Sequence, residues 1–345
     1  HYILTSDIDL SATEYTSAVI APDTDNSYIY VFNGTSFTGT FNGNGHTISG
    51  LTIVGRYNDH SGLFGKNKGR IENLGLVNCD ISGDYCVAML AANNSGTISK
   101  CYATGNLNGK NYFVGGLAGR NWGKIIYSYC TVNITNGFSY IGGLAGENAN
   151  SDIYQSYATG SISTSLFTRC VGGFTGNNHY GNIIHCYSTV EVSGGEGAST
   201  GAFVGDGANG IINCYFLDTA GRDNGLGEPL TDSQMRSKQY YQDWNFTDTE
   251  TGKVGKWYLP DGSYPLCWWQ YENIYTMPFV LDMTLQQAHD ELTSSGFSVG
   301  EIIYYDSFSV DPNYVLDIPV EQNALYLDIT PPVDIYVSTG SDANG

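Results

Sequence analysis

Residues 60–216 repeat one short pattern of apolar and polar positions six times. Three copies are nearly identical: Val114-Gly-Gly-Leu-Ala-Gly119, Ile141-Gly-Gly-Leu-Ala-Gly146 and Val171-Gly-Gly-Phe-Thr-Gly176. Looser copies begin at His60, Val87 and Thr200, so that successive copies start 27 to 30 residues apart. A fixed period of this length predicts stacked structural repeats, each too small to bury a core of its own.

Apolar and small residues recur in fixed columns of the repeat. The columns are Leu63, Leu90, Leu117, Leu144, Phe174 and Phe203; Ile71, Ile98, Ile125, Ile153, Ile183 and Ile211; and Leu74, Cys101, Ser128, Ser156, Cys186 and Cys214. Residues between these apolar or small columns are polar or aromatic, which gives the period-two pattern of strands. Glycines and asparagines mark tight turns. The pattern predicts an all-β parallel β-helix with about three short strands per coil, each coil adding about 4.8 Å.

The repeat resembles a known family. Val114-Gly-Gly-Leu-Ala-Gly119, a following isoleucine and the run Cys101-Tyr-Ala-Thr-Gly105 are similar to the GLUG repeat of secreted and surface proteins of bacteria and archaea. The resemblance covers residues 60–220, implies a β-helix outside the cell or on its surface, and brings no shared catalytic residues. Residues 1–59 resemble the opening coils of the same proteins, so we expect the β-helix to span residues 1–275.

A Trp-rich segment follows the repeats at residues 221–275 and resembles the closing element of the same family. A solenoid needs its open end covered, and we expect this segment to cap the last coil. Trp268 and Trp269 within it are also candidates for binding sugar.

The composition changes near Met277, where a second domain is expected at residues 276–345. Thr284-Leu-Gln-Gln287 is a capping box that predicts a helix through Leu292, ended by Gly296. Strands are expected at residues 298–305, 315–319 and 333–337. This α+β segment resembles a PASTA domain, a module of bacterial penicillin-binding proteins and kinases of which some bind peptidoglycan fragments. Its usual Pro-x-x-Gly is replaced by Pro319-Val-Glu-Gln-Asn-Ala324, so a spacer or docking role is an equal expectation.

The net charge of −20 limits the partners of this chain. With 14 lysines and arginines against 34 acidic residues, it cannot neutralise nucleic-acid phosphates or bind an anionic membrane surface. No run of 18 apolar residues predicts insertion into a membrane. The chain starts without methionine in a strand-like segment, and we expect a processed product or a fragment.

The cysteines and sequons fit an extracellular protein. The 8 cysteines lack the CxxC spacing of structural zinc sites. Most are expected as small buried hydrophobic residues, although Cys186 and Cys214 would lie on neighbouring coils at a spacing that permits a disulfide. Candidate glycosylation sites are the sequon asparagines Asn33, Asn93, Asn133 and Asn245.

Two polar or aromatic columns are candidate surfaces. Stacked amides, bonded to one another and to the turn backbone, are expected from Asn67, Asn94, Asn121, Asn148 and Asn178. A second column directly follows the inward Cys/Ser column, so its rings should point outward as a strip about 20 Å long: Tyr102, Tyr129, Tyr157, Tyr187 and Tyr215. The strip either stabilises the fold by stacking or is a platform for sugar rings or a neighbouring subunit.

The charged residues do not gather into a catalytic pattern. Asp7 and Asp9 share a face, as paired acid–base carboxylates do, but the family resemblance makes them structural. Another column contains Lys66, Asn93, Arg120, Glu147, Asn177 and Asp206, in which Arg120 and Glu147 should form a surface ion pair. We therefore expect no enzyme, no catalytic residue, no metal site and no cofactor; a calcium site on Asp and Asn oxygens is not localised by the sequence.

These observations favour a non-enzymatic structural or adhesive protein of the cell surface. Its expected partners are other copies of itself, including a self-assembling filament or sheath, or other surface proteins. The alternative is a β-helix protein that binds or degrades polysaccharide.

Overall fold

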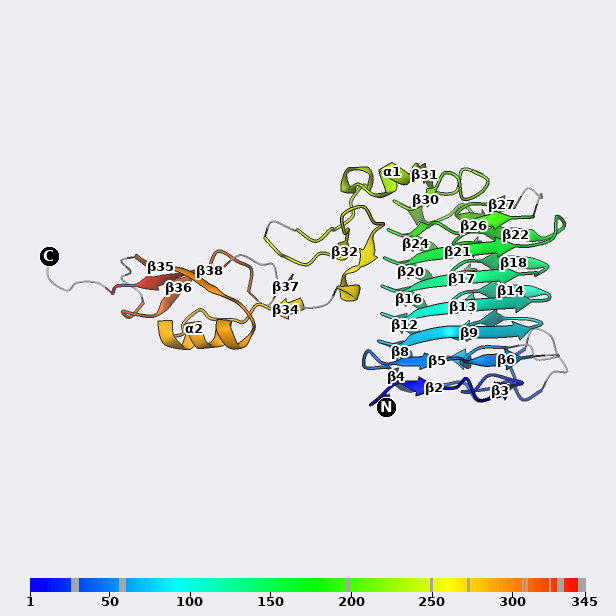
Figure 1. Cartoon of the computed structure of the whole chain (residues 1–345), viewed down its shortest axis with the longest axis horizontal. Coiled ribbons are helices and arrows are strands. Elements are labelled where there is room, and N and C mark those ends of the chain that lie inside the picture. The colour runs from blue at the N-terminus through cyan, green and yellow to red at the C-terminus, as the bar shows by residue number, and fades with distance from the viewer. Residues whose placement is uncertain are drawn as a thin grey trace. The chain divides into compact units, whose positions relative to one another are not determined.

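The computed structural model describes residues 1–25, 31–55, 60–195, 199–248, 251–271, 274–305, 307, 310–322, 324–327 and 332–340. The chain divides into two compact units, His1–Asp243 and Trp244–Gly345. Each unit is described by itself. Figure 1 shows the first unit as rows of parallel strands and the second as a smaller group of strands with a helix along one side of its sheet.

The first unit is a parallel β-solenoid in which one complete coil contributes four strands rather than the expected three. In the central coil these are β15 (Ala118–Asn121), β16 (Lys124–Ile126), β17 (Tyr129–Thr135) and β18 (Ser139–Gly142). Each strand pairs with its counterparts one coil before and one coil after it. Four sheets therefore run along the solenoid, one on each side of the coil.

Two of the sheets hold the longer rows. Sheet 1 contains, in spatial order, β1 (Tyr2–Ile3), β4 (Thr40–Asn42), β8 (Arg70–Glu72), β12 (Thr97–Ser99), β16, β20 (Asp152–Tyr154), β24 (Asn182–Ile184) and β29 (Ile211–Ile212). Sheet 2 contains β2 (Ile8–Asp9), β3 (Glu14–Tyr15), β5 (Thr47–Ser49), β6 (Thr52–Val54), β9 (Gly75–Gly83), β13 (Tyr102–Gly109), β17, β21 (Tyr157–Ser163), β25 (Tyr187–Ser188), β26 (Glu191–Ser193), β30 (Tyr215–Leu217) and β31 (Glu228–Leu230).

The other two sheets begin at the repeats. Sheet 3 contains β7 (Phe64–Asn67), β11 (Ala91–Asn94), β15, β19 (Ala145–Ala149), β23 (Thr175–His179) and β28 (Val204–Asp206). Sheet 4 contains β10 (Val87–Ala88), β14 (Tyr112–Gly115), β18, β22 (Arg169–Gly172) and β27 (Thr200–Gly201).

The columns of the sequence are the columns of the structure. Ile98 pairs with Ile71 on one side and Ile125 on the other, and all three side chains are buried. The leucine column is buried as well, and its last two members, Phe174 and Phe203, stack with ring centroids 5.0 Å apart. Each fully buried side chain of this size stabilises the fold by roughly 1.5–3 kcal/mol, so the inward columns form one continuous core.

Non-glycine residues in the left-handed backbone conformation turn two corners of each coil. One set precedes the inward Cys/Ser column: Asn73, Lys100, Tyr127, Gln155, His185 and Asn213. The other set lies at the start of the sheet 4 strands, just before β10 or as the second residue of β14, β18 and β22: Cys86, Phe113, Tyr140 and Cys170. This conformation costs about 1–2 kcal/mol for most residues. Hydrogen bonds between coils, such as Tyr127 N to Tyr154 O at 3.2 Å, hold these corners in place.

The solenoid continues past its last repeat by part of a coil. The strand β31 pairs in parallel with β30, and a short helix follows, α1 (Asp232–Met235), with a complete capping box on Thr231. Met235 is buried, and the Tyr241 hydroxyl donates to its carbonyl oxygen at 2.6 Å. A short 3₁₀ helix, η1 (Lys238–Tyr240), lies between Met235 and Tyr241. The expected capping by the Trp-rich residues stays a prediction, since Trp244 onward belongs to the second unit.

The second unit begins with a small aromatic group. The rings of Trp244 and Trp257 stack with centroids 4.3 Å apart. Strands β32 (Trp257–Tyr258) and β33 (Leu266–Cys267) pair antiparallel, and the turn η2 (Trp268–Gln270) follows. Val254 N donates to Leu325 O at 2.8 Å, so this group is tied by its backbone to the strands that come later in the chain.

The expected helix and strands are present in the rest of the unit. The helix α2 (Leu285–Ser294) has its capping box on Thr284 and buries Ala288 and Leu292. Strands β35 (Val299–Tyr305), β36 (Val315–Asp317) and β38 (Val333–Ser338) form one sheet in the order β35-β38-β36. The sequence did not predict β34 (Ile274–Thr276) and β37 (Leu325–Leu327), which pair antiparallel with each other.

Candidate functional site

The asparagine ladder is a continuous hydrogen-bonded chain inside the solenoid. The Nδ2 atoms of Asn67, Asn94, Asn121 and Asn148 each donate to the Oδ1 atom of the next asparagine, at 2.7–2.8 Å. All five amides are buried. Because every member is both donor and acceptor, the predicted column is a structural element that links successive coils.

The tyrosine column is stacked, as the strand pattern predicts. Neighbouring ring centroids from Tyr102 to Tyr187 lie 4.8–5.1 Å apart, with planes within 7° of parallel. None of these rings belongs to the hydrophobic core cluster of the solenoid, whose members Cys101 and Ala103 flank Tyr102. Tyr102 and Tyr129 are half-buried, and the remaining three rings are buried. The expected outward strip of five rings is therefore accessible to solvent only at Tyr102 and Tyr129.

The mixed-charge column lies on the outer side of sheet 3, and its two central charges, Arg120 and Glu147, contact each other. Arg120 Nε donates to Glu147 Oε2 at 2.8 Å, which is the expected ion pair. The same guanidinium lies 4.4 Å from the ring centroid of Phe113 and 5.1 Å from that of Trp122. The Phe113 ring in turn stacks on Tyr140. Such cation–π contacts and the pair with Glu147 hold Arg120 in one position.

A buried His–Asp pair lies near Lys66 and Arg120 of this column, and the repeat pattern did not predict it. His60 Nδ1 lies 2.8 Å from Asp23 Oδ2, and both side chains are 2% exposed. Burial lowers the pKa of His60. The attraction of Asp23 raises this pKa and offsets the effect of burial only in part, whereas the positive charges of Lys66 and Arg120 lower it further. Asp23 comes from a segment outside the repeat, so the pattern could not place it.

We expect acidification to destabilise the first unit through His60. Its folded-state pKa lies below the ordinary value, so between those two pKa values the unfolded chain binds more protons and stability falls as the pH falls. Urea unfolding followed at pH 7.5, 6 and 5 measures this, and His60→Gln should flatten that part of the profile. The exposed histidine variant His179→Gln is the matched control. A profile that His60→Gln leaves unchanged would contradict the assignment.

The predicted disulfide between Cys186 and Cys214 is not formed. All eight cysteines lie in the described part of the chain as free thiols. The two thiols lie in the inward column, as expected, but Cys186 Sγ donates to Ile184 O at 3.3 Å and Cys214 Sγ to Ile183 O at 3.2 Å. Adjacent positions in one column therefore do not suffice for a bond, because each thiol is directed at a backbone carbonyl.

The buried thiols should be unreactive in the native protein. Burial raises the pKa of Cys101 to about 12 and raises the pKa of Cys130 as well. The thiolate is the nucleophile, so alkylation of both by iodoacetamide at pH 8 should be roughly a hundredfold or more slower than in urea. Peptide mapping by mass spectrometry measures this, with Cys170, 9% exposed, as the comparison that reacts first. Equal native and denatured rates at Cys101 would contradict the packing.

The remaining predicted residues lie at separate places on the surface. Asn33, Asn133 and Asn245 are exposed, whereas Asn93 is only 8% exposed between Lys66 and Arg120. Asn93 is therefore not a suitable glycan acceptor in the folded chain. Trp268 and Trp269 are partly exposed in η2. These candidates and the tyrosine column are not gathered into one site by either unit taken alone.

The first acidic pair is structural. Asp7 Oδ1 accepts from Thr47 N at 2.8 Å, and Asp9 Oδ1 accepts from Ser11 N at 2.9 Å. These backbone and side-chain hydrogen bonds hold the pKa values of both carboxyl groups below the ordinary value. Across the described residues, histidine, cysteine, aspartate and glutamate side chains do not form a group of three that could hold a metal ion.

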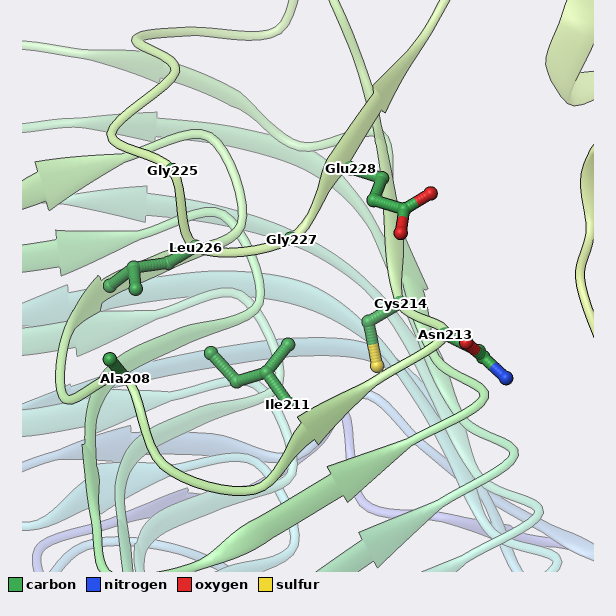
Figure 2. Close-up of a pocket in the computed structure, with 8 residues that line it drawn as sticks. All are labelled: Ala208, Ile211, Asn213, Cys214, Gly225, Leu226, Gly227 and Glu228. Atoms are coloured by element: carbon green, nitrogen blue, oxygen red, sulfur yellow. The ribbon is translucent and has the colours of Figure 1, made fainter.

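Two small cavities lie near the C-terminal end of the solenoid. The larger, about 250 Å³, is shown in Figure 2 and lies between the 208–214 turn and the 225–228 loop. Its wall is mainly backbone and apolar side chains, with Glu228 and Asn213 at its edge. The other, about 230 Å³, is lined by residues 177–180 and by Asp206, Gly207 and Asn209. The sequence did not predict either cavity.

Comparison with known proteins identifies the repeat. The model of the GLUG motif matches residues 139–163 and 168–193. The solenoid carries GLUG motifs. Over 119 residues the chain is 37% identical to Halomucin of Haloquadratum walsbyi. The aligned segment covers 32% of this chain and 1% of Halomucin. Over 105 residues it is 28% identical to the Putative Gly-rich membrane protein of Evansella cellulosilytica, 28% of this chain and 12% of that one.

The chain thus spans a small part of the curated relatives it matches. The comparison with solved structures gives no match. Within the described residues, no helix has the length and apolar character needed to cross a membrane.

Proposed function

We propose that this chain is part of a non-enzymatic extracellular surface protein, in which the solenoid is a rigid structural or adhesive rod. The observation that supports it most is the buried asparagine ladder, which joins five successive coils through direct amide contacts. Such a continuous ladder resists slippage between coils. The names of the two relatives, a halomucin and a membrane protein, are consistent with a place at the cell surface.

The charges of the chain support the same role. Arg120 and Glu147 neutralise each other, and the acidic pair near the N-terminus bonds to backbone amides. Reactive groups in enzymes are instead held ready for a substrate. A net charge of −20 keeps exposed rods apart and soluble.

The test is the location of the chain on intact cells. An antibody raised against the purified chain should label unpermeabilised source cells, and protease treatment of those cells should remove the signal. An antibody against a cytosolic enzyme is the control for cell integrity. Labelling that appears only after permeabilisation would contradict a surface location.

We propose further that residues 276–345 are a PASTA-like spacer or docking module. The helix with its capping box and the β35-β38-β36 sheet support this assignment. If the module docks, the full chain should bind to purified cell walls or to another surface protein through this region, and removing the region should abolish that binding; a spacer predicts no such binding. Unchanged wall binding by a chain ending at residue 243, which lacks the whole second unit, would contradict docking.

A polysaccharide-binding or polysaccharide-degrading protein is the second candidate function. The half-buried tyrosines Tyr102 and Tyr129 and the exposed ring of Trp122 favour it, since aromatic rings are common in sugar sites. A glycan array reports binding, and an ultraviolet absorbance assay for unsaturated products reports cleavage by a lyase. Release of unsaturated sugar would replace the structural proposal by an enzymatic one.

Assembly is a separate part of the proposal. We favour a tethered stalk or adhesin over a filament or sheath subunit, because the ladders account for stiffness within one chain. Light scattering over a concentration series should then give the mass of a monomer throughout. Growth of mass with concentration, together with fibres in micrographs, would favour the filament.

A further inference from the structure

The cavity of about 230 Å³ lies where the asparagine ladder ends. Strand β28 pairs with β23 so that Asp206 lies beside Asn177, which puts Gly207 beside Asn178. At Gly207 the backbone has φ +89°, and a Cβ atom there would lie 2.1 Å from Asn178 O. The coil of β28 therefore has no amide side chain where the five preceding coils have one, and the cavity lies at this end of the ladder.

The floor of this cavity is already bonded within the fold. Asn178 Nδ2 donates to Gly181 O at 3.0 Å and to Asn209 O at 2.6 Å. Its Oδ1 atom accepts from Asn148. Both polar atoms of the Asn178 amide are therefore bonded within the fold and not available to a ligand.

The groups left for a ligand are Asp206 and Asn177. Asp206 is exposed, and only its Oδ1 atom has a backbone donor, Gly207 N at 2.9 Å. Its Oδ2 atom has a distant contact with Cys170 Sγ at 4.0 Å. Among the described residues no basic side chain forms an ion pair with Asp206. Asp206 and Asn177 therefore line the cavity with one exposed carboxylate and one half-buried amide side chain.

An aromatic ring lies at the rim in a costly backbone conformation. Tyr180 has φ +55° and its side chain is 66% exposed, with the ring edge-to-face against His179 at 4.5 Å. The equivalent residue of the preceding coil is Asn150, with φ +48°. Asparagine tolerates this conformation, whereas a tyrosine pays about 1–2 kcal/mol for it. Packing does not explain the ring, since two thirds of it is in solvent.

We propose that this cavity binds one sugar unit of an uncharged glycan. The Tyr180 ring offers a flat apolar face to the C–H face of a pyranose, Asp206 accepts from neighbouring hydroxyl groups through charge-assisted hydrogen bonds, and Asn177 donates or accepts beside it. Asp206 and the acidic chain repel acidic sugars. Calcium needs six to eight oxygen ligands, more than the single carboxylate and amide here supply.

A sugar site would supply the ligand for the adhesive role proposed above, and it depends on that proposed function only for its biological purpose. Binding by the purified chain is measured without cells. A negative result for surface labelling therefore leaves the sugar site standing, and a negative result for sugar leaves the surface location standing.

The test is saturation-transfer NMR on the full chain with mannotriose, cellotetraose and galactotriose, and with a hyaluronate tetrasaccharide as the acidic probe. We expect weak binding, roughly millimolar, to at least one neutral probe and none to hyaluronate. Tyr180→Ala and Asp206→Asn should each weaken it about tenfold. Phe138→Ala, which removes a ring 47% exposed on another loop, should leave it unchanged.

Two results would overturn the proposal. One is the absence of transfer to any neutral probe by the wild-type chain. The other is binding that survives both Tyr180→Ala and Asp206→Asn, which would place the sugar elsewhere, such as the tyrosine column. A calcium titration followed by calorimetry completes the set, and a calcium affinity lost in Asp206→Asn without sugar binding would assign the cavity to a cation instead.

Discussion

Asn121→Ala is expected to lower the free energy of unfolding of the first unit by about 3–5 kcal/mol. Asn121 is fully buried at the centre of the ladder. It accepts from Asn94 Nδ2 at 2.7 Å and donates to Asn148 Oδ1 at 2.8 Å. Alanine removes both bonds at once and leaves a buried donor and a buried acceptor without these partners, each of which costs about 1–3 kcal/mol.

The matched control is an asparagine stack on the surface of the same coil. Asn133 donates to Asn106 Oδ1 at 3.3 Å and is exposed, so Asn133→Ala should change stability by about 0.5 kcal/mol or less. Urea unfolding followed by circular dichroism measures both variants. Equal losses in the two variants would show that the buried ladder has no special part in holding the coils together.

The repeat allowed the register of the solenoid to be predicted from the sequence. A period of 27 to 30 residues puts equivalent residues on neighbouring strands, so a column in the sequence becomes a row in the structure. The pairs Ile98 with Ile125 and Tyr102 with Tyr129 follow in this way. Column identity also gave the asparagine ladder, because identical amides one coil apart are close enough to bond.

The corners of the coil could not be predicted in the same way. Lys100 and Tyr127 take the left-handed conformation with φ near +50°, although neither residue type favours it. The conformation is imposed by hydrogen bonds to the neighbouring coils, which are tertiary. With these corners unseen, the sequence predicted about three strands in each coil instead of the four that form.

Site residues that belong to the repeat could be predicted, whereas those that break the repeat could not. Stacking of the tyrosines depends on the repeat and was predicted. The His60–Asp23 pair and the cavity beside Asp206 depend on residues that break the repeat, Asp23 in an insertion and Gly207 in place of an asparagine. The glycosylation candidate Asn93 was wrong for a related reason: it is buried, and a sequon does not indicate how exposed its asparagine is.

Leu117→Ala is expected to lower the free energy of unfolding by about 3–5 kcal/mol, the range for a fully buried leucine whose site cannot collapse. Leu117 is 0% exposed, and its amide donates to Leu144 O at 2.9 Å in the next coil. The four sheets around it are fixed by their hydrogen bonds, so the cavity should stay open. Leu117→Met, which nearly conserves volume, should cost about 1 kcal/mol.

The matched control is Leu166→Ala, which removes a leucine that is 55% exposed in a loop of the same solenoid and should change stability by about 0.5 kcal/mol or less. Native-state hydrogen exchange adds a second readout. Each coil contacts only its neighbours, so Leu117→Ala should speed exchange most in β11, β15 and β19 and least in β1 and β4. Uniform acceleration along the whole solenoid would instead mean that the coils unfold as one unit, and that the core column is cooperative over its full length.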